Sequence, residues 1–167
     1  MRRKDRALND DEALKIIDKS AFGVISCADD DKIFSVPISI VRDDMSVFIH
    51  GAPGGAKARL LKDGKEVELV CVIDARVPDF SEEKIDEMIS QNKASNIFTT
   101  EYKSVVASTK AYEITDDERK IYALKILSQK LTPKYMRAFD KAIQESLKRT
   151  KVWELKIKNL SAKAKIL

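Results

Sequence analysis

The chain has 167 residues, 44% of them hydrophobic, which is enough for one domain with a sizeable core. Its 31 Lys and Arg residues nearly balance its 27 Asp and Glu residues, which argues against a nucleic-acid-binding protein, because such proteins gather basic residues on one face. No run approaches the roughly 18 apolar residues of a membrane span, and no Cys/His cluster indicates a metal site.

Two cysteines, Cys27 and Cys71, lie inside apolar, strand-like runs. The sequence opens without a signal peptide and contains no further cysteine. We therefore expect two reduced core thiols in a cytoplasmic protein rather than a disulfide.

The first predicted element is a helix that begins after Asn9. Asn9 is a good cap, Glu12 follows three residues later, and Leu14 and Ile17 recur at helical spacing.

Four short apolar runs follow, and they predict strands over residues 21–28, 33–41, 46–50 and 66–75. The run 33–41 alternates, with Phe34, Val36, Ile38 and Ile40 on one face and Ser35, Pro37 and Ser39 on the other. The turn-forming residues 42–45 predict a hairpin between strands 33–41 and 46–50.

The second half of the chain alternates helices with two further strands, predicted over residues 102–114 and 152–158. Ser81 caps a short predicted helix, and Thr115 with Glu118 forms a capping box for the next. Thr132-Pro133 begins a third helix, because proline is favoured in a first helical turn.

These elements predict an α+β fold, a six-stranded antiparallel β-barrel with peripheral helices. The first four strands lack the long crossovers that a parallel sheet needs. We expect one domain over residues 1–167, with the helices of residues 115–149 packed on the barrel.

The stretch Ile49 to Leu61 contains the only histidine, His50, and three of the five glycines. A helix over residues 56–62 places Lys57 within about 60° of both Leu60 and Leu61, on the face turned to the core. A lysine there needs an anionic partner, because burying an unpaired charge is costly. The partner is either a buried carboxylate or the phosphate of a ligand, and spacing alone does not choose between them.

The small residues of the run 33–41 allow two interpretations. They form the polar face of an ordinary edge strand, or they leave room for a flat ligand or a second subunit. Pro37 indicates an edge strand in either case, because proline cannot donate to a sheet ladder.

The sequence resembles the nitroimidazole-resistance branch of the pyridoxamine-phosphate-oxidase-like flavoproteins. The motifs that carry this resemblance occur in the family's order along nearly the whole chain: MRRKDRALNDDEA, SVPISIV, VFIHGAPGGAKARLL, YKSVVAS, AYEITDDERKIYALKILSQKLTP and VWELKIKNLSAK. The resemblance implies a split β-barrel homodimer with FMN, or FAD, at the subunit interface.

The resemblance also implies which residues bind the flavin. Lys57 and Arg59 match a phosphate-binding Lys-x-Arg pair, and the other matching positions are Ser35, Val36, Pro37, Ile38, Ser39, Ile49, His50, Gly51, Ala52, Ser104 and Val105. His50 is the candidate catalytic residue, as a proton donor or a hydrogen-bond partner of flavin or substrate, and a structural role is its alternative.

The activity implied by the resemblance is that of a flavin-dependent oxidoreductase. NAD(P)H reduces the flavin, which then reduces a small acceptor, for which a nitroaromatic compound is one candidate. The alternatives are a non-catalytic flavin-binding or regulatory protein, and a split-barrel protein that binds haem or a deazaflavin.

Overall fold

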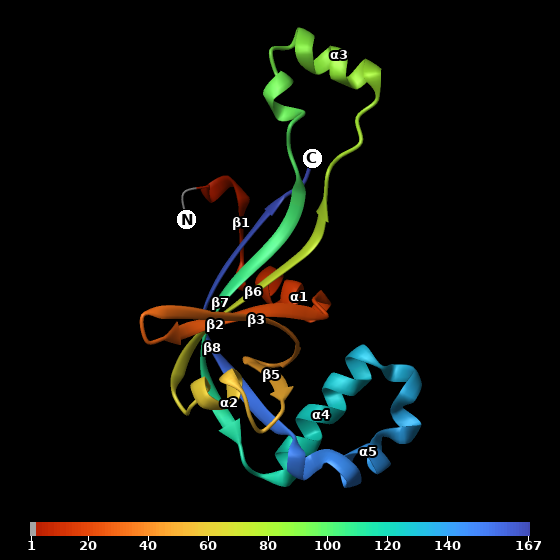
Figure 1. The fold of residues 1–167 in the computed structure, drawn as a ribbon. Coiled ribbons are helices and arrows are strands. Elements are labelled where there is room, and N and C mark those ends of the chain that lie inside the picture. Colours follow the sequence, from red (N-terminus) through yellow and green to blue (C-terminus); the bar gives the residue numbers. More distant parts are fainter. Residues whose placement is uncertain (1–2) are drawn as a thin grey trace.

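The computed structural model describes residues 3–167 of the chain, and its body is one antiparallel sheet of eight strands (Figure 1). The strand order is β3-β2-β6-β7-β8-β5-β4, and β1 pairs with β8 beside this path. The strands are β1 Ala7–Leu8, β2 Phe22–Asp29, β3 Lys32–Ser39, β4 Val41–Asp43, β5 Ser46–Gly51, β6 Lys65–Arg76, β7 Glu101–Ile114 and β8 Lys151–Lys165.

The predicted α+β class and antiparallel pairing are confirmed, but the strand count is eight rather than six. The predicted hairpin between residues 33–41 and 46–50 is wrong for most of its length. The predicted strand breaks at Ile40, so that β3 pairs with β2 and only the three residues of β4 pair with β5. Alternating apolar and polar residues show which residues share a face of a strand, but they do not show which strand pairs with it.

Strand β8 extends well beyond the predicted residues 152–158. Ser108 pairs with Asn159 and Thr109 with Ile157, which leaves Lys158 as the extra residue of a β-bulge. A bulge shifts the side-chain alternation by one residue, so the periodic pattern stops there although the strand continues.

Within residues 3–167, five α-helices accompany the sheet: α1 Asp10–Lys19, α2 Ala56–Leu60, α3 Glu82–Ser90, α4 Asp117–Leu131 and α5 Phe139–Ser146. Short 3₁₀ helices span Lys4–Arg6, Ala94–Asn96, Pro133–Ala138 and Leu147–Arg149. The part of the chain that the structure describes has no helix long and apolar enough to cross a membrane.

The predicted helix starts are confirmed in part. Asn9 and Glu12 form the predicted capping box of α1, and Ser81 caps α3. The capping box predicted from Thr115 is wrong, because the neighbouring Asp116 caps α4 and accepts a 2.8 Å hydrogen bond from the backbone N–H of Arg119.

The hydrophobic core forms two clusters on either side of β5 and β8. The larger cluster lies between α1, α2 and the inner face of the sheet, and Trp153, Leu155 and Leu69 are fully buried in it. The smaller cluster packs α4 against β4, β5, β7 and β8 through Val41, Phe48, Ile114, Ala123, Leu127 and Val152. Cys27 and Cys71 are buried, unbridged thiols.

Lys130 links α4 to the end of α1 and to the residue before β4. Its Nζ donates hydrogen bonds to the carbonyl oxygens of Ser20 (2.7 Å), Ile40 (3.1 Å) and Ile17 (3.4 Å). These groups lie at the end of α1 and before β4, so one partly buried ammonium group connects three elements.

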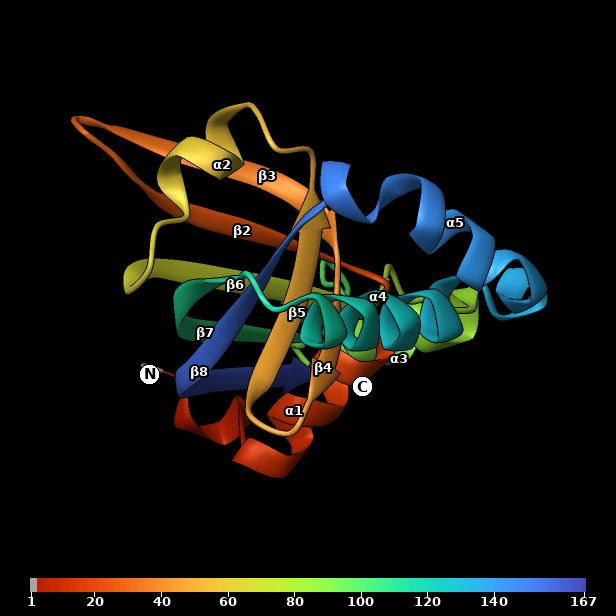
Figure 2. The same ribbon diagram turned by 90° about the horizontal axis from the view of Figure 1, so that it is seen from below.

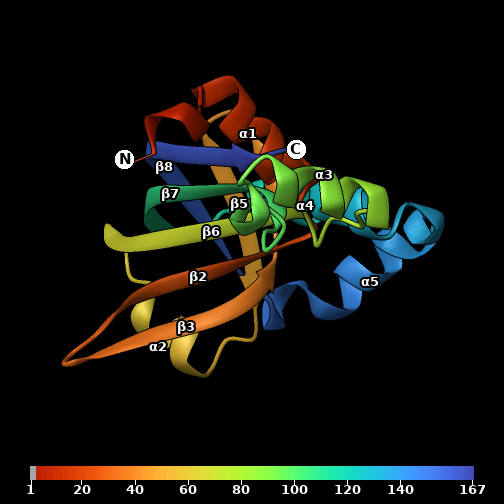
Figure 3. The same cartoon turned by 90° about the horizontal axis from the view of Figure 1, so that it is seen from above.

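The molecule is elongated, and its two ends carry different helices. Residues 77–100, called the arm below, include α3 and extend beyond the ends of β6 and β7 (Figure 1). Residues 117–149, called the helical cap below, include α4 and α5 and lie at the opposite end (Figure 1). Seen along the long axis, from below in Figure 2 and from above in Figure 3, α3 and the helical cap lie on the same side of the barrel.

Candidate functional site

The candidate site is built on the corner between β5 and α2. Strand β5 ends at Gly51, and the chain turns through residues 52–55 before α2 begins. Gly55 has a φ of 91°, a conformation that favours glycine. Helix α2 has only five residues, so the charge available to a ligand at this corner comes from a side chain rather than from a helix dipole.

Lys57 lies where the helical spacing predicts, beside the buried Leu60 and Leu61. Its side chain is half-buried, and its Nζ lies 3.3 Å from the carbonyl oxygen of His50. No carboxylate within residues 3–167 lies within 4.0 Å of this Nζ, so the described chain does not supply the predicted anionic partner. Burial lowers the pKa of Lys57, as expected for a charge that lacks a counter-ion.

Gly51 makes room for this lysine. A Cβ atom placed on Gly51 would lie 3.0 Å from both Cε and Nζ of Lys57, and 3.4 Å from Cζ3 of Trp153. Trp153 is itself fixed, because its Nε1 donates a 3.1 Å hydrogen bond to the carbonyl oxygen of Leu61. The glycine and the tryptophan therefore hold the ammonium group at the end of β5.

His50 lies next to Lys57 and has an unsatisfied polar atom. Its Nδ1 is buried and has no hydrogen-bond partner among the described residues. Burial, and secondly the charge of Lys57, lower the pKa of His50, which keeps the imidazole neutral at neutral pH. A buried ring nitrogen without a partner is unusual and fits a site that a ligand completes.

Arg59 lies on another side of α2, because residues two positions apart in a helix are separated by about 200° around its axis. Its guanidinium is exposed and forms a bidentate ion pair with Asp29 at the end of β2, at 2.6 and 2.7 Å. This pairing lowers the pKa of the Asp29 carboxyl. The structure therefore separates the two cations that the resemblance grouped together.

The predicted residues of β3 divide between the two faces of an edge strand. Ser35 and Pro37 are exposed and Ser39 is half-exposed on the outer face, while Ile38 is buried in the core. Val36 packs against the core from the same side as Ile38. The position of β3 at the sheet edge confirms the edge strand that Pro37 predicted.

The two predicted residues of β7 also face opposite ways. Val105 is fully buried in the core, whereas Ser104 lies on the outer face. In the register of the sheet, Pro37 pairs with Val24, Val24 with Val70, and Val70 with Val106. Ser104 thus shares one outer sheet face with the small residues of β3, while Lys57 and His50 form a separate group at the end of β5.

Sequence reasoning missed the apolar character of this outer face. Phe22, Val24, Val72 and Val106 lie on it, and between 40% and 64% of each residue is exposed. A signal was present, because the run 21–28 is apolar on both strand faces, a pattern typical of strands that are covered on both sides. We call Phe22, Val24, Val70, Val72 and Val106 the apolar sheet face.

Comparison with known proteins identifies the family. The sequence profile of the pyridoxamine 5'-phosphate oxidase family matches residues 9–164. No protein with a curated description matches the chain in sequence. The chain belongs to the pyridoxamine 5'-phosphate oxidase family, as its motifs indicated.

Solved structures share the fold at low sequence identity. The flavocytochrome Anf3 from Azotobacter vinelandii is 22% identical with a TM-score of 0.75, over 100% of this chain and 72% of that one. A FAD- and haem-binding protein from Mycobacterium smegmatis is 19% identical with a TM-score of 0.71, over 93% and 71% of the two chains. A Bacteroides thetaiotaomicron protein, provisionally described as a 5-nitroimidazole antibiotic resistance protein, is 15% identical with a TM-score of 0.68, over 95% and 86%.

Proposed function

We propose that the protein is a flavin-dependent oxidoreductase that binds FMN through Lys57. The observation that carries this proposal is the half-buried ammonium group of Lys57, which has one carbonyl partner and no carboxylate among the described residues. A phosphate at this corner would supply the missing negative charge. FAD carries a phosphate at the same position of its riboflavin part and is the alternative cofactor.

Four features of the corner and of β3 support a flavin. Gly51 leaves the space that Lys57 occupies, and the orphaned Nδ1 of His50 provides a polar atom for a ligand or substrate. Ile49 is buried beneath the corner, and Ala52 is exposed in the turn beside it, so neither blocks the approach of a flat ring. The small, exposed Ser35 and Pro37 allow close packing along the edge strand.

When bound, the flavin would supply the redox chemistry, accepting electrons from NAD(P)H and passing them to a small acceptor. The chain would hold the phosphate with Lys57, and the neutral His50 would orient the ring or the acceptor by a hydrogen bond. As a proton donor, His50 would need protonation that its lowered pKa opposes, so the hydrogen-bonding role is favoured.

We further propose a homodimer built on the apolar sheet face. Exposed valines and a phenylalanine on one continuous sheet are unfavourable in water and mark an interaction surface. Ser35, Pro37 and Ser39 of β3 and Ser104 of β7 lie on or beside this face, so dimerisation would cover them. We place the protein in the cytoplasm, where buried free thiols such as Cys27 and Cys71 stay reduced.

The absorption spectrum of the purified protein tests the cofactor directly. We expect a yellow protein whose flavin band disappears when NAD(P)H is added without oxygen, and whose colour returns with a nitroaromatic acceptor. Colourless protein that takes up no FMN would refute the proposal, and yellow protein that no nicotinamide reduces would favour a non-catalytic flavin carrier.

Haem is a second candidate ligand because His50 offers a ring nitrogen without a partner. Two proteins of this fold carry haem according to their descriptions, one a flavocytochrome and one a FAD- and haem-binding protein. The same spectrum separates the candidates, because haem gives a Soret band that a flavin lacks.

A further inference from the structure

The arm exposes apolar side chains that its own fold cannot bury. Phe98 is 89% exposed, Val77 74% and Ile89 54%, and neither α3 nor the 3₁₀ helix Ala94–Asn96 contains a buried residue. A small helical unit with no buried residue is weakly held by its own packing. Its apolar surface is therefore explained only if something else covers it.

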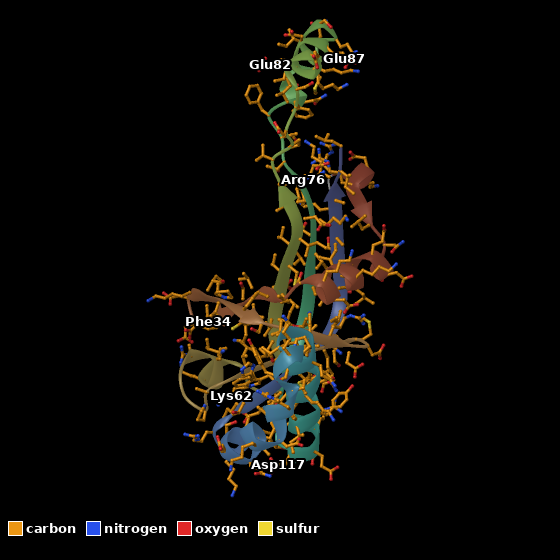
Figure 4. The ribbon with its side chains drawn as sticks, turned by 90° about the vertical axis from the view of Figure 1, so that its right-hand side faces the viewer. Phe34, Lys62, Arg76, Glu82, Glu87 and Asp117 are labelled. Atoms are coloured by element: carbon orange, nitrogen blue, oxygen red, sulfur yellow. The ribbon has the colours of Figure 1, made fainter. Side chains whose placement is uncertain are left out.

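The arm is also acidic. It contains five Asp and Glu residues against two Lys residues. Glu87 forms an ion pair with Lys84, whereas Asp79, Glu82, Glu83 and Asp86 have no cationic side chain within 4.0 Å among residues 3–167. Glu82 and Glu87 mark this end of the molecule in Figure 4.

The opposite end of the molecule is basic. The helical cap contains nine Lys and Arg residues against four Asp and Glu residues. Its exposed cations without a carboxylate within 4.0 Å, again among residues 3–167, are Lys125, Lys134, Arg137, Lys148 and Arg149. Tyr135, which is 69% exposed, lies among them. Figure 4 places Asp117 of the cap far from Glu82 of the arm, so the two charged regions cannot meet within one copy.

We propose that the arm of one copy docks on the helical cap of a second copy. A two-fold axis perpendicular to the long axis brings each arm next to the partner's cap, since both lie on the same side of the barrel (Figures 2 and 3). Four unpaired carboxylates then face five unpaired cations, and Phe98 and Ile89 gain apolar cover against the cap. The apolar sheet face lies between the two ends, so the arm contacts extend the same interface.

This inference rests on the homodimer of the proposed function, and it adds the orientation of the two copies. Complementary charge at such a contact selects the antiparallel arrangement, because a parallel pair would place arm beside arm and like charges together. The partner's arm would also cover the candidate site. Strand β5 and the helical cap are neighbours, so an arm docked on the cap would border the corner that holds Lys57 and His50.

A charge-swap experiment tests the arrangement. One variant reverses the arm with E82K, E83K and D86K, and a second reverses the cap with K125E, K134E and R137E. Each variant alone pairs like charges in both contacts, so its dimer dissociation constant, measured by analytical ultracentrifugation, should rise at least about tenfold. Mixing the two variants restores opposite charges in both contacts of the heterodimer, and its affinity should return to within about threefold of the wild type.

Matched measurements keep the test decisive. K93E adds an acidic residue to the arm and should not weaken the dimer, while F98S should weaken it. Circular dichroism checks that each variant folds. A monomeric wild type, full dimer affinity in both reversed variants, or failure of the mixture to restore it would overturn the proposal. FMN titration of the same samples reports the cofactor separately, so dimers without flavin binding would refute the proposed function alone.

Discussion

Replacing Lys57 by Met removes the charge at the β5–α2 corner and keeps most of the side-chain volume. In the free protein this ammonium group makes one long hydrogen bond, 3.3 Å to the His50 carbonyl, and is partly desolvated. Its removal should therefore leave the free energy of unfolding unchanged or slightly raised, since burying an unpaired charge is unfavourable. In the proposed flavin complex the same group would face a phosphate, where a charge-assisted hydrogen bond would contribute about 1.5–3 kcal/mol.

The loss corresponds to a roughly 10- to 150-fold increase in the dissociation constant for FMN. Riboflavin lacks the phosphate, so its affinity should change by less than about threefold. Fluorescence quenching of each flavin measures both constants, and K62M serves as the control because Lys62 is exposed and lies only five residues away (Figure 4). An equal loss of FMN and riboflavin binding, or equal effects of K57M and K62M, would show that Lys57 does not bind the phosphate.

Three further predictions concern His50, Lys130 and Gly23. The pKa of His50 in the folded protein lies below its ordinary 6.5, so the unfolded state binds the proton first as pH falls, and stability is lost below about pH 6.5. In urea titrations, H50Q should therefore lose less unfolding free energy than the wild type between about pH 7 and pH 5. An identical loss in the two proteins would contradict this prediction. K130M should lower the unfolding free energy by about 2–4 kcal/mol, because it leaves carbonyl oxygens without a donor. K62M, which changes an exposed lysine without an ion pair within residues 3–167, should change it by less than about 0.5 kcal/mol. Equal unfolding midpoints of the two variants would refute the role of Lys130. G23A should lower the unfolding free energy by about 1–3 kcal/mol through overpacking, because the added Cβ would lie 2.5 Å from the Cδ1 methyl group of the buried Leu69. G54A is the control: its Cβ meets no atom within 4 Å, so the unfolding free energy should not change in the same assay.

The sequence predicted the helices and strands better than it predicted which strands pair and which side chains meet. The alternation of residues 33–41 placed Ile38 in the core and Pro37 on an edge, yet it could not show that β3 pairs with β2 rather than β5. The helical angle of Lys57 relative to Leu60 and Leu61 correctly placed this lysine against the core. It could not exclude a carboxylate partner, because such a partner depends on the tertiary fold.

Other features depend on which surfaces the folded chain leaves uncovered. Phe98 and Val106 are apolar, and only the structure shows that both are exposed, one on the arm and one on the apolar sheet face. The separation of Arg59 from Lys57 was visible in the helix geometry, whereas the pairing of Arg59 with Asp29 was not, since thirty residues separate them along the chain. These features require the three-dimensional arrangement, and the exposure of Phe98 and Val106 also supports the proposed second copy.

The central claim is that the corner of Gly51, His50 and Lys57 binds the phosphate of a flavin. The most direct measurement is the affinity of the wild-type protein for FMN and for riboflavin under identical conditions. The geometry of Lys57 predicts FMN binding that is at least about tenfold tighter, corresponding to one charge-assisted contact. Equal affinity for the two flavins, or no binding of either, would contradict the claim.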